Sequence, residues 1–212
     1  MGVIKAEGIE NLKSDFLEPH FFMIIIGKPG CGKTAMIKEL ILNEKCYFQA
    51  FDNVFFITPS DVDELEMCDE TRSKTLDMDW VYDKLSTVQD GSNVLFVFDD
   101  MISQINMNKD PRLYEFIFNR RHLIKGGVVS LILTSQKYTM IPAKIRPQIS
   151  SLVIFKSAPT EIKKVREECW HGSSLVFNDL ISQAFASMYS FVYLRLSDNT
   201  FYINFEKKYG FV

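Results

Sequence analysis

The stretch "IIIGKPGCGKTAMIKEL", residues 24–40, decides the fold because it sets a glycine-rich loop between a buried strand and a helix. It fits the pattern Gly-x-x-x-x-Gly-Lys-Ser/Thr at every fixed position, with Gly27, Gly32, Lys33 and Thr34. The glycines let the backbone curl so that successive N–H groups face an anion, and the positive end of the helix dipole favours the same anion. The stretch therefore predicts a phosphate-binding loop.

The chemistry expected of this loop is nucleotide binding. Lys33 should reach the β- and γ-phosphates of ATP and act in catalysis, and the Thr34 hydroxyl should bind Mg²⁺. Cys31 is expected to be a small spacer and not a nucleophile. The residues expected to contact the nucleotide are Gly27, Lys28, Pro29, Gly30, Cys31, Gly32, Lys33 and Thr34.

Apolar runs alternate with helical patterns along the rest of the chain. This alternation predicts an α/β fold of three layers, with a mostly parallel sheet covered by helices on both faces. Residues 61–79 are acidic and show no strand signal, so they are interpreted as a surface loop with at most a short helix. The predicted strands are 21–26, 53–58, 93–101, 128–136 and 151–156, and the predicted helices after the loop helix are 80–88, 111–125, 160–169 and 175–187.

The C-terminal residues have a different pattern. Two alternating runs flank Ser197-Asp198-Asn199 and predict a β-hairpin. We expect a single domain over residues 1–212, with its core at about 15–157 and C-terminal helices and a hairpin in 158–212.

Two carboxylates, Asp99 and Asp100, follow the apolar run "VLFVF". Ligands of open α/β sheets bind at the carboxyl ends of the strands. Asp99 is expected to hold Mg²⁺. Asp100 could act as general base on the attacking water, although a helix-capping role is the alternative.

The next strand ends in Thr134-Ser135-Gln136. P-loop ATPases of the additional-strand type place a polar sensor of the γ-phosphate at this point, so Gln136 is a candidate; a glutamine that merely ends a strand is the alternative. Arg120 and Arg121 could reach a neighbouring subunit's γ-phosphate, with Arg146 as a third candidate. Their alternative role is to complement a helix dipole.

Charge is unevenly distributed along the chain. Residues 1–100 hold 9 Lys/Arg and 19 Asp/Glu, a net of −10, whereas residues 101–212 hold 15 and 8, a net of +7. The second half could therefore present a basic face to a polyanion, although chance segregation explains the counts equally well. The cysteines show no CxxC spacing and no apolar run is long enough for a membrane span, which favours an intracellular, reducing compartment without a membrane partner.

The ordered motifs "HFFMIIIGKPGCGKT", "VLFVFDDM", "NRRHL", "LILTSQ" and "IPAKIRPQISSLVIFK" resemble the genome-packaging ATPases of poxviruses and giant DNA viruses, in the FtsK/HerA superfamily. The resemblance covers about residues 15–157. It implies a RecA-like P-loop fold and a homo-oligomeric ring that moves double-stranded DNA without reading its sequence. A capsid vertex protein would be a partner, and the virus factory or virion would be the location. Cellular relatives usually have Glu at the position of Asp100.

Carried over by residue, the resemblance implies Lys33 and Thr34 for nucleotide and metal, Asp99 for Mg²⁺ and Asp100 as catalytic carboxylate. It also implies Gln136 as sensor and Arg120 or Arg121 as the trans-acting arginine. Two other functions remain open from the residues. They are a nucleoside or nucleotide kinase, and a structural protein gated by nucleotide with little turnover.

Overall fold

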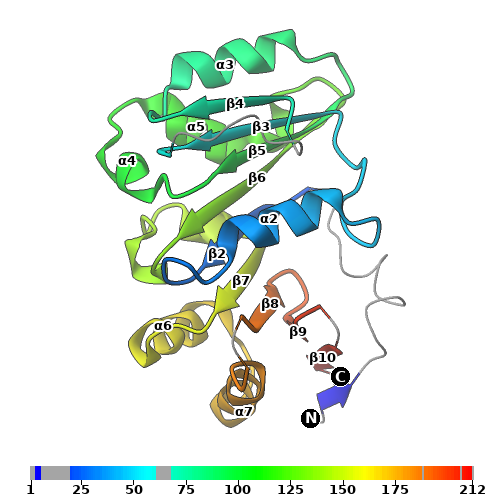
Figure 1. The fold of residues 1–212 in the computed structure, drawn as a ribbon, viewed down its shortest axis with the longest axis vertical. Helices are drawn as coiled ribbons and strands as arrows, with labels where there is room; N and C mark the ends of the chain where they lie inside the picture. The colour runs from blue at the N-terminus through cyan, green and yellow to red at the C-terminus, as the bar shows by residue number, and fades with distance from the viewer. Residues whose placement is uncertain (1–2, 6–19, 61–67, 188, 206, 212) are drawn as a thin grey trace.

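The computed structural model describes residues 3–5, 20–60, 68–187, 189–205 and 207–211, and its strands form one ten-stranded sheet (Figure 1). The strand order is β1-β10-β9-β8-β7-β2-β6-β5-β3-β4. The strands are β1 (Val3–Lys5), β2 (Phe22–Ile26), β3 (Asn53–Thr58), β4 (Glu70–Ser73), β5 (Asn93–Phe98), β6 (Val128–Ser135), β7 (Ser151–Phe155), β8 (Phe191–Arg195), β9 (Thr200–Ile203) and β10 (Lys207–Phe211). The helices are α2 (Lys33–Leu42), α3 (Met78–Thr87), α4 (Ile102–Met107), α5 (Pro111–Asn119), α6 (Pro159–Cys169) and α7 (Ser174–Ala184), with the 3₁₀ turns η2 (Arg120–His122), η3 (Tyr138–Met140) and η4 (Arg146–Gln148).

The parallel part of the sheet, β4-β3-β5-β6-β2-β7, confirms the predicted fold class. Strand β2 leads into the phosphate loop and β5 leads into Asp99, yet the two strands are not neighbours. Strand β6 lies between them and pairs with both in parallel register. An inserted strand of this kind is typical of P-loop ATPases of the additional-strand type. The polar carboxyl end of β6 therefore lies between the phosphate loop and the carboxylates.

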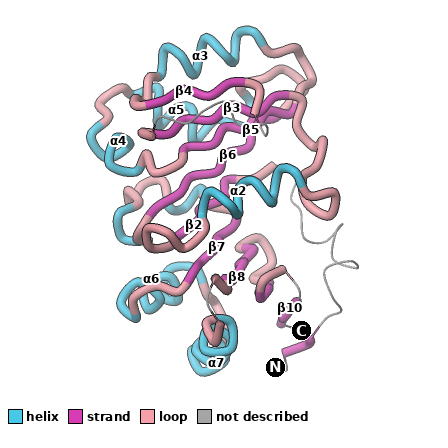
Figure 2. The backbone as a smooth tube through the Cα atoms, viewed as in Figure 1, coloured by secondary structure: helices cyan, strands magenta, loops and turns pink. Residues whose placement is uncertain are grey.

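Alternating side chains of the central strands enter two separate cores, as the pleat of a strand requires. In β2, Ile24 and Ile26 face the core covered by α3, α4, α5, α6 and α7. Met23 and Ile25 face the core covered by α2, which lies across the sheet in Figure 2. Burial on both faces explains why these strands read as continuous apolar runs.

The predicted C-terminal hairpin is present as β8 and β9, with Arg195 and Asp198 paired across its turn. What the sequence did not indicate is that the hairpin continues the main sheet. Strand β8 pairs antiparallel with β7, β10 pairs with β9, and β1 from the other end of the chain pairs with β10. Figure 1 shows the two ends of the chain side by side at this edge.

The interpretation of 61–79 as loop is wrong in one part. Residues 61–67 lie outside the described residues, but Glu70–Ser73 form β4, which pairs in parallel with β3 at the opposite edge of the sheet. The sequence Glu-Thr-Arg-Ser has no apolar run because an edge strand needs only backbone partners.

The helices differ from the prediction at two places. The helix predicted over 111–125 begins as expected, with Asp110 accepting a hydrogen bond from the Arg112 N–H and Pro111 at the first position, but its α-helical part ends at Asn119. Helix α4 had not been predicted. Within the described part of the chain, the helices are too short or too polar to span a bilayer.

Gly127 marks a close backbone approach at the start of β6. A Cβ atom there would overlap the carbonyl oxygen of Ser92 and lie 2.8 Å from its nitrogen. We expect Gly127→Ala to lower the free energy of unfolding by about 1–3 kcal/mol, because the crowded atoms belong to the backbone and cannot rotate away. Chemical denaturation measures this, with Ser92→Ala as a control near wild type. Equal stability of Gly127→Ala and wild type would contradict the crowding.

Candidate active site

The phosphate loop joins β2 to α2 and depends on glycine at three positions. Gly30 and Gly32 have φ of 75° and 101°, in the region that other residues rarely adopt. Gly27 is required for a different reason, since a Cβ there would overlap Sγ of Cys31 and lie 2.9 Å from Cβ of Phe155. The backbone curl inferred from the sequence is therefore present.

Lys33 lies folded along its own loop. Its Nζ donates hydrogen bonds to the carbonyl oxygens of Gly27 at 3.0 Å and Lys28 at 3.3 Å. Burial raises the pKa of the Cys31 thiol, even though the Lys33 ammonium acts in the opposite direction. Cys31 therefore stays protonated at neutral pH, as a spacer would.

Asp99 is held by two threonine hydroxyls from different elements. Thr34 Oγ1 donates to Oδ2 at 2.8 Å, and Thr134 Oγ1 donates to Oδ1 at 2.7 Å. The aspartate is buried, so these partners offset much of the cost of removing a carboxylate from water. The contacts tie the first turn of α2 and the ends of β5 and β6 to one carboxylate.

Asp100 is fixed through the same threonine. Its N–H donates to Thr134 Oγ1 at 2.8 Å, and its φ of 57° lies in the left-handed region. Aspartate tolerates that region better than most residues, yet the conformation must be held by its surroundings. The backbone turn separates the two carboxylates, with Asp99 buried and Asp100 exposed.

Thr134 connects the two candidate carboxylates, and the sequence did not indicate this role. Its hydroxyl donates to one catalytic candidate, Asp99, and accepts from the backbone of the other, Asp100. A threonine near the end of a largely apolar strand was visible in the sequence. Only the strand order shows that it faces β5.

Gln136 lies beside the start of the phosphate loop. The Gly27 N–H donates to the carbonyl oxygen of Ser135 at 3.0 Å, where β2 and β6 end side by side. Gln136 is the next residue after this contact, and its side chain is exposed. The structure thus brings the ends of β2, β5 and β6 together with the predicted residues on them.

The oxygen atoms of Thr34 and Asp99 fit Mg²⁺. They lie 2.8 Å apart, so one cation could replace the hydrogen bond between them. Among the described residues, no cluster of three or more His, Cys, Asp or Glu could hold a metal by itself. Mg²⁺ at NTP sites commonly takes one or two protein oxygens and completes its shell with phosphates and water, which suits this pair.

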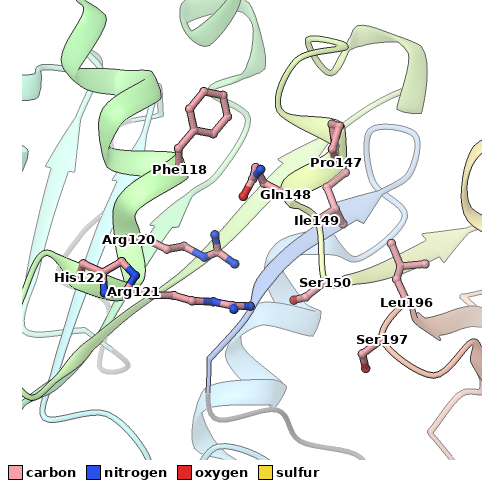
Figure 3. Close-up of a pocket in the computed structure, with 10 residues that line it drawn as sticks. All are labelled: Phe118, Arg120, Arg121, His122, Pro147, Gln148, Ile149, Ser150, Leu196 and Ser197. Carbon is pink, nitrogen blue, oxygen red and sulfur yellow. The ribbon is translucent and has the colours of Figure 1, made fainter.

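The three arginine candidates lie in different environments. Arg120 and Arg121 follow α5 (Figure 3) and lie at the amino ends of the parallel strands, whereas the phosphate loop lies at their carboxyl ends. Arg120 Cζ lies 5.8 Å from the centre of the Phe22 ring. Arg120 is buried, whereas Arg121 is exposed. Arg146 bonds Ile141 and Thr139 carbonyls and pairs with Glu168 at 3.0 Å. Within one chain, these arginines do not meet the loop.

Two pockets of about 450 and 510 Å³ adjoin the phosphate loop. Cys31, Phe155 and Tyr189 line both of them. Tyr189 is 64% exposed and has a φ of 64°, an uncommon conformation for a bulky residue. No sequence signal marked Tyr189, which precedes β8 far along the chain from the loop.

Several solved structures that are similar to this fold are of viral packaging proteins. The genome packaging NTPase B204 from Sulfolobus turreted icosahedral virus 2, in complex with AMP, matches with a TM-score of 0.62 at 13% identity, covering 88% of this chain and 98% of that one. Its complex with ATP-gammaS gives 0.60 at 13% identity, covering 88% and 97%. The DNA-packaging ATPase B204 from Sulfolobus turreted icosahedral virus gives 0.60 at 16% identity, covering 88% and 98%. At these identities the likeness establishes the fold.

The family described as "Poxvirus A32 protein" matches residues 10–183, which is most of the chain. A search among curated proteins finds no match. The family and structural comparisons together confirm the resemblance to viral genome-packaging ATPases that the motifs indicated.

Thr134→Val should reveal how much the shared hydroxyl stabilises the site. The exchange keeps shape and β-branching but leaves Asp99 Oδ1 and the Asp100 N–H without that partner. We expect the free energy of unfolding to fall by about 1–3 kcal/mol, as measured by chemical denaturation. Thr58→Val is the matched control, since Thr58 is also buried at a strand end but accepts only one longer bond, 3.3 Å from Ser60 N. Equal losses in the two variants would contradict a special role for Thr134.

Proposed function

Because the chain belongs to the poxvirus A32 protein family, we propose that it is an Mg²⁺-dependent ATPase that moves double-stranded DNA into a viral capsid as a homo-oligomeric ring. One observation carries this proposal. Thr34 and Thr134 donate hydrogen bonds to Asp99, and the Asp100 N–H donates to Thr134. These contacts hold the two carboxylates at the ends of the adjacent strands β5 and β6, beside the phosphate loop. Supporting it, proteins of the same fold described as packaging NTPases were solved with AMP and ATP-gammaS.

ATP binding would use the loop backbone and Lys33. The N–H groups at the start of α2 and the Lys33 ammonium would contact the β- and γ-phosphates. Thr34 and Asp99 would hold Mg²⁺, which neutralises charge on the phosphate oxygens when bound. Lys28, Pro29 and Gly30 are exposed and would border the phosphates from the loop side.

Hydrolysis would depend on Asp100 and Gln136. Asp100 would accept a proton from the attacking water. The oxygen of that water would bond to the γ-phosphorus while the bond between this phosphorus and the β–γ bridging oxygen breaks. Gln136, one residue beyond the Gly27–Ser135 contact, would orient that water by hydrogen bonding. The Thr134 hydroxyl would fix the Asp100 backbone and so act as a positioning residue.

The adenine base would lie against Tyr189. Both pockets beside the loop include Tyr189 and Phe155, and each extends from the loop toward β8. Tyr189 has an exposed aromatic ring beside the phosphate site, and its backbone has an uncommon conformation. Such a ring is well suited to stack on a base.

DNA contacts and neighbouring subunits would involve basic residues of the second half. Lys137 is exposed and follows Gln136 directly, so a backbone phosphate of DNA bound there would be one residue from the proposed sensor. Such contacts give sequence-independent, strongly salt-dependent binding. Of the candidate trans-acting arginines, exposure favours Arg121, because Arg120 is buried and Arg146 is engaged within its own chain.

In an infected cell, the ring would work at the virus factory in the cytoplasm or at the virion, with a capsid vertex protein as partner. The residues 1–212 would act as a single ATPase domain, since the described strands share one sheet.

The motor proposal predicts that ATP turnover depends on both DNA and protein concentration. Adding duplex DNA should raise the rate per chain severalfold, and the rate should rise steeply with protein concentration, because a trans-acting arginine can contribute roughly 10³–10⁵ in rate. A phosphate-release assay over a concentration series, with and without DNA, measures both effects.

Asp100→Asn is the control for this assay. Loss of a general base should lower turnover by about 10²–10⁴-fold while ATP affinity stays near wild type. An ATP turnover rate that does not change with DNA at any protein concentration would contradict the motor proposal. Unchanged turnover in Asp100→Asn would instead favour a nucleotide-gated structural protein.

Tyr189→Ala should weaken ATP binding by about tenfold, because stacking on a base contributes roughly 1–3 kcal/mol. Tyr189→Phe keeps the ring and should bind ATP nearly as wild type does. Titration calorimetry with a non-hydrolysable analogue measures both affinities. Leu175→Ala, at a residue of α7 that is 78% exposed and lies outside the two pockets, is the matched control. Equal affinity of Tyr189→Ala and wild type would rule out the stacking role.

A further inference from the structure

The loop that follows β6 carries two residues of the proposed function, the sensor Gln136 and the neighbouring Lys137. Both side chains are exposed, so packing in the core does not fix either of them. On the β6 side, the Ser135 hydroxyl donates to the Lys137 carbonyl oxygen at 2.7 Å. The position of Gln136 therefore also depends on what holds the other side of the loop.

That other side is bound to the first turn of α6 through Thr139 and Glu161. The Thr139 N–H donates to Glu161 Oε2 at 3.0 Å, and the Thr139 hydroxyl donates to Oε1 at 2.8 Å. Each oxygen of the carboxylate thus accepts from a different group of the same residue. Two charge-assisted hydrogen bonds of this kind fix the orientation of Thr139 as well as its distance from α6.

A glutamate in the first turn of a helix is commonly explained by the helix dipole. In the described part of the chain, however, the Glu161 carboxylate accepts hydrogen bonds from Thr139, 22 positions earlier, and not from N–H groups of α6. Glu161 is only 8% exposed, and a buried carboxylate is costly unless hydrogen bonds compensate it. Burial of Glu161 therefore favours the one loop conformation that brings both Thr139 donors to it.

A second glutamate of α6 contacts the same turn. Tyr138 is buried, and its hydroxyl donates to Glu168 Oε2 at 2.8 Å. Glu161 and Glu168 are seven residues apart, which places them two turns apart on one face of α6. The turn η3 therefore lies along α6, with the Tyr138 contact fixing a side chain and the Glu161 contact fixing the backbone.

The start of α6 also borders the nucleotide loop. Ala158 and Pro159, a few residues before Glu161, line the pocket of about 510 Å³ together with loop residues 28–31. Glu161 thus connects the segment that borders the phosphate loop to the segment that carries Gln136.

We propose that Glu161 is a positioning residue, which holds Gln136 in place for ATP hydrolysis through its two hydrogen bonds to Thr139. This inference rests on the proposed function of Gln136. Glu161 takes no part in the proton transfer, because its carboxylate is buried against the loop.

Glu161→Met tests this role, since it removes both hydrogen bonds and keeps a chain of similar length. In the full chain we expect kcat for ATP to fall about tenfold, because displacing a group that orients a reactant carries a cost of this order or more. KM should change by less than about twofold, since the phosphate contacts remain. A phosphate-release assay over a range of ATP concentrations measures both constants.

Two further variants sharpen this measurement. Glu161→Gln should recover most of the lost kcat, because its amide oxygen can accept from the Thr139 N–H while its NH₂ group donates to the Thr139 hydroxyl. Glu167→Met, at an exposed glutamate of the same helix, removes the same charge and should keep the wild-type kcat.

The Gln136→Ala background separates positioning from general destabilisation. If Glu161 acts through Gln136, adding Glu161→Met to Gln136→Ala should change kcat by less than about twofold. An equal fall in both backgrounds would overturn the positioning role and leave the sensor role of Gln136 intact. Unchanged kcat in Gln136→Ala alone would contradict the sensor role, and the inference would fall with it.

Hydrogen exchange tests the contact without ATP turnover. The Thr139 N–H should exchange about tenfold faster in Glu161→Met than in wild type, and near the wild-type rate in Glu161→Gln, as measured by NMR. Unchanged protection in Glu161→Met would overturn the inference even if kcat falls. Should Glu161→Met fail to fold, Thr139→Val removes the hydroxyl contact alone, and its smaller loss of kcat should likewise vanish in Gln136→Ala.

Discussion

The buried carboxylate of Asp99 is the constraint on which the nucleotide site depends. Two hydroxyls, from Thr34 at the start of α2 and Thr134 near the end of β6, each donate a hydrogen bond to one of its two oxygens. Because an unpartnered carboxylate could not be buried at this point without a large cost, the three elements must keep their mutual positions. The same threonine holds the backbone of Asp100, so the geometry of the exposed carboxylate follows from the stability of the buried one.

The central strands carry charged side chains at both of their ends. Their carboxyl ends carry the loop and the carboxylates, and their amino ends adjoin a pocket of about 460 Å³ that Arg120 and Arg121 line (Figure 3). Phe22 and Ile26 are the first and last residues of β2, so a single strand of five residues runs from this pocket to the phosphate loop.

The sequence predicted the central strands, the loop and the carboxylates because each has a local signal, namely an apolar run or a fixed spacing. Strand β4 has no such signal, since an edge strand is held through its backbone. Nor could the sequence separate Arg120 from Arg121, which are adjacent but differ completely in burial. The positions of Tyr189 and Thr134 beside the candidate site could not be predicted from the sequence, because they depend on the strand order, which brings together segments far apart in the chain.

The position of Lys33 has a thermodynamic consequence. Its ammonium is already solvated by two carbonyl oxygens of its own loop, so the curled backbone is maintained by an internal cation before a nucleotide arrives. Association then exchanges those carbonyl contacts for phosphate contacts. The ordering of the loop is largely complete beforehand, and the favourable enthalpy of the lysine–phosphate contact is partly cancelled by the bonds it breaks.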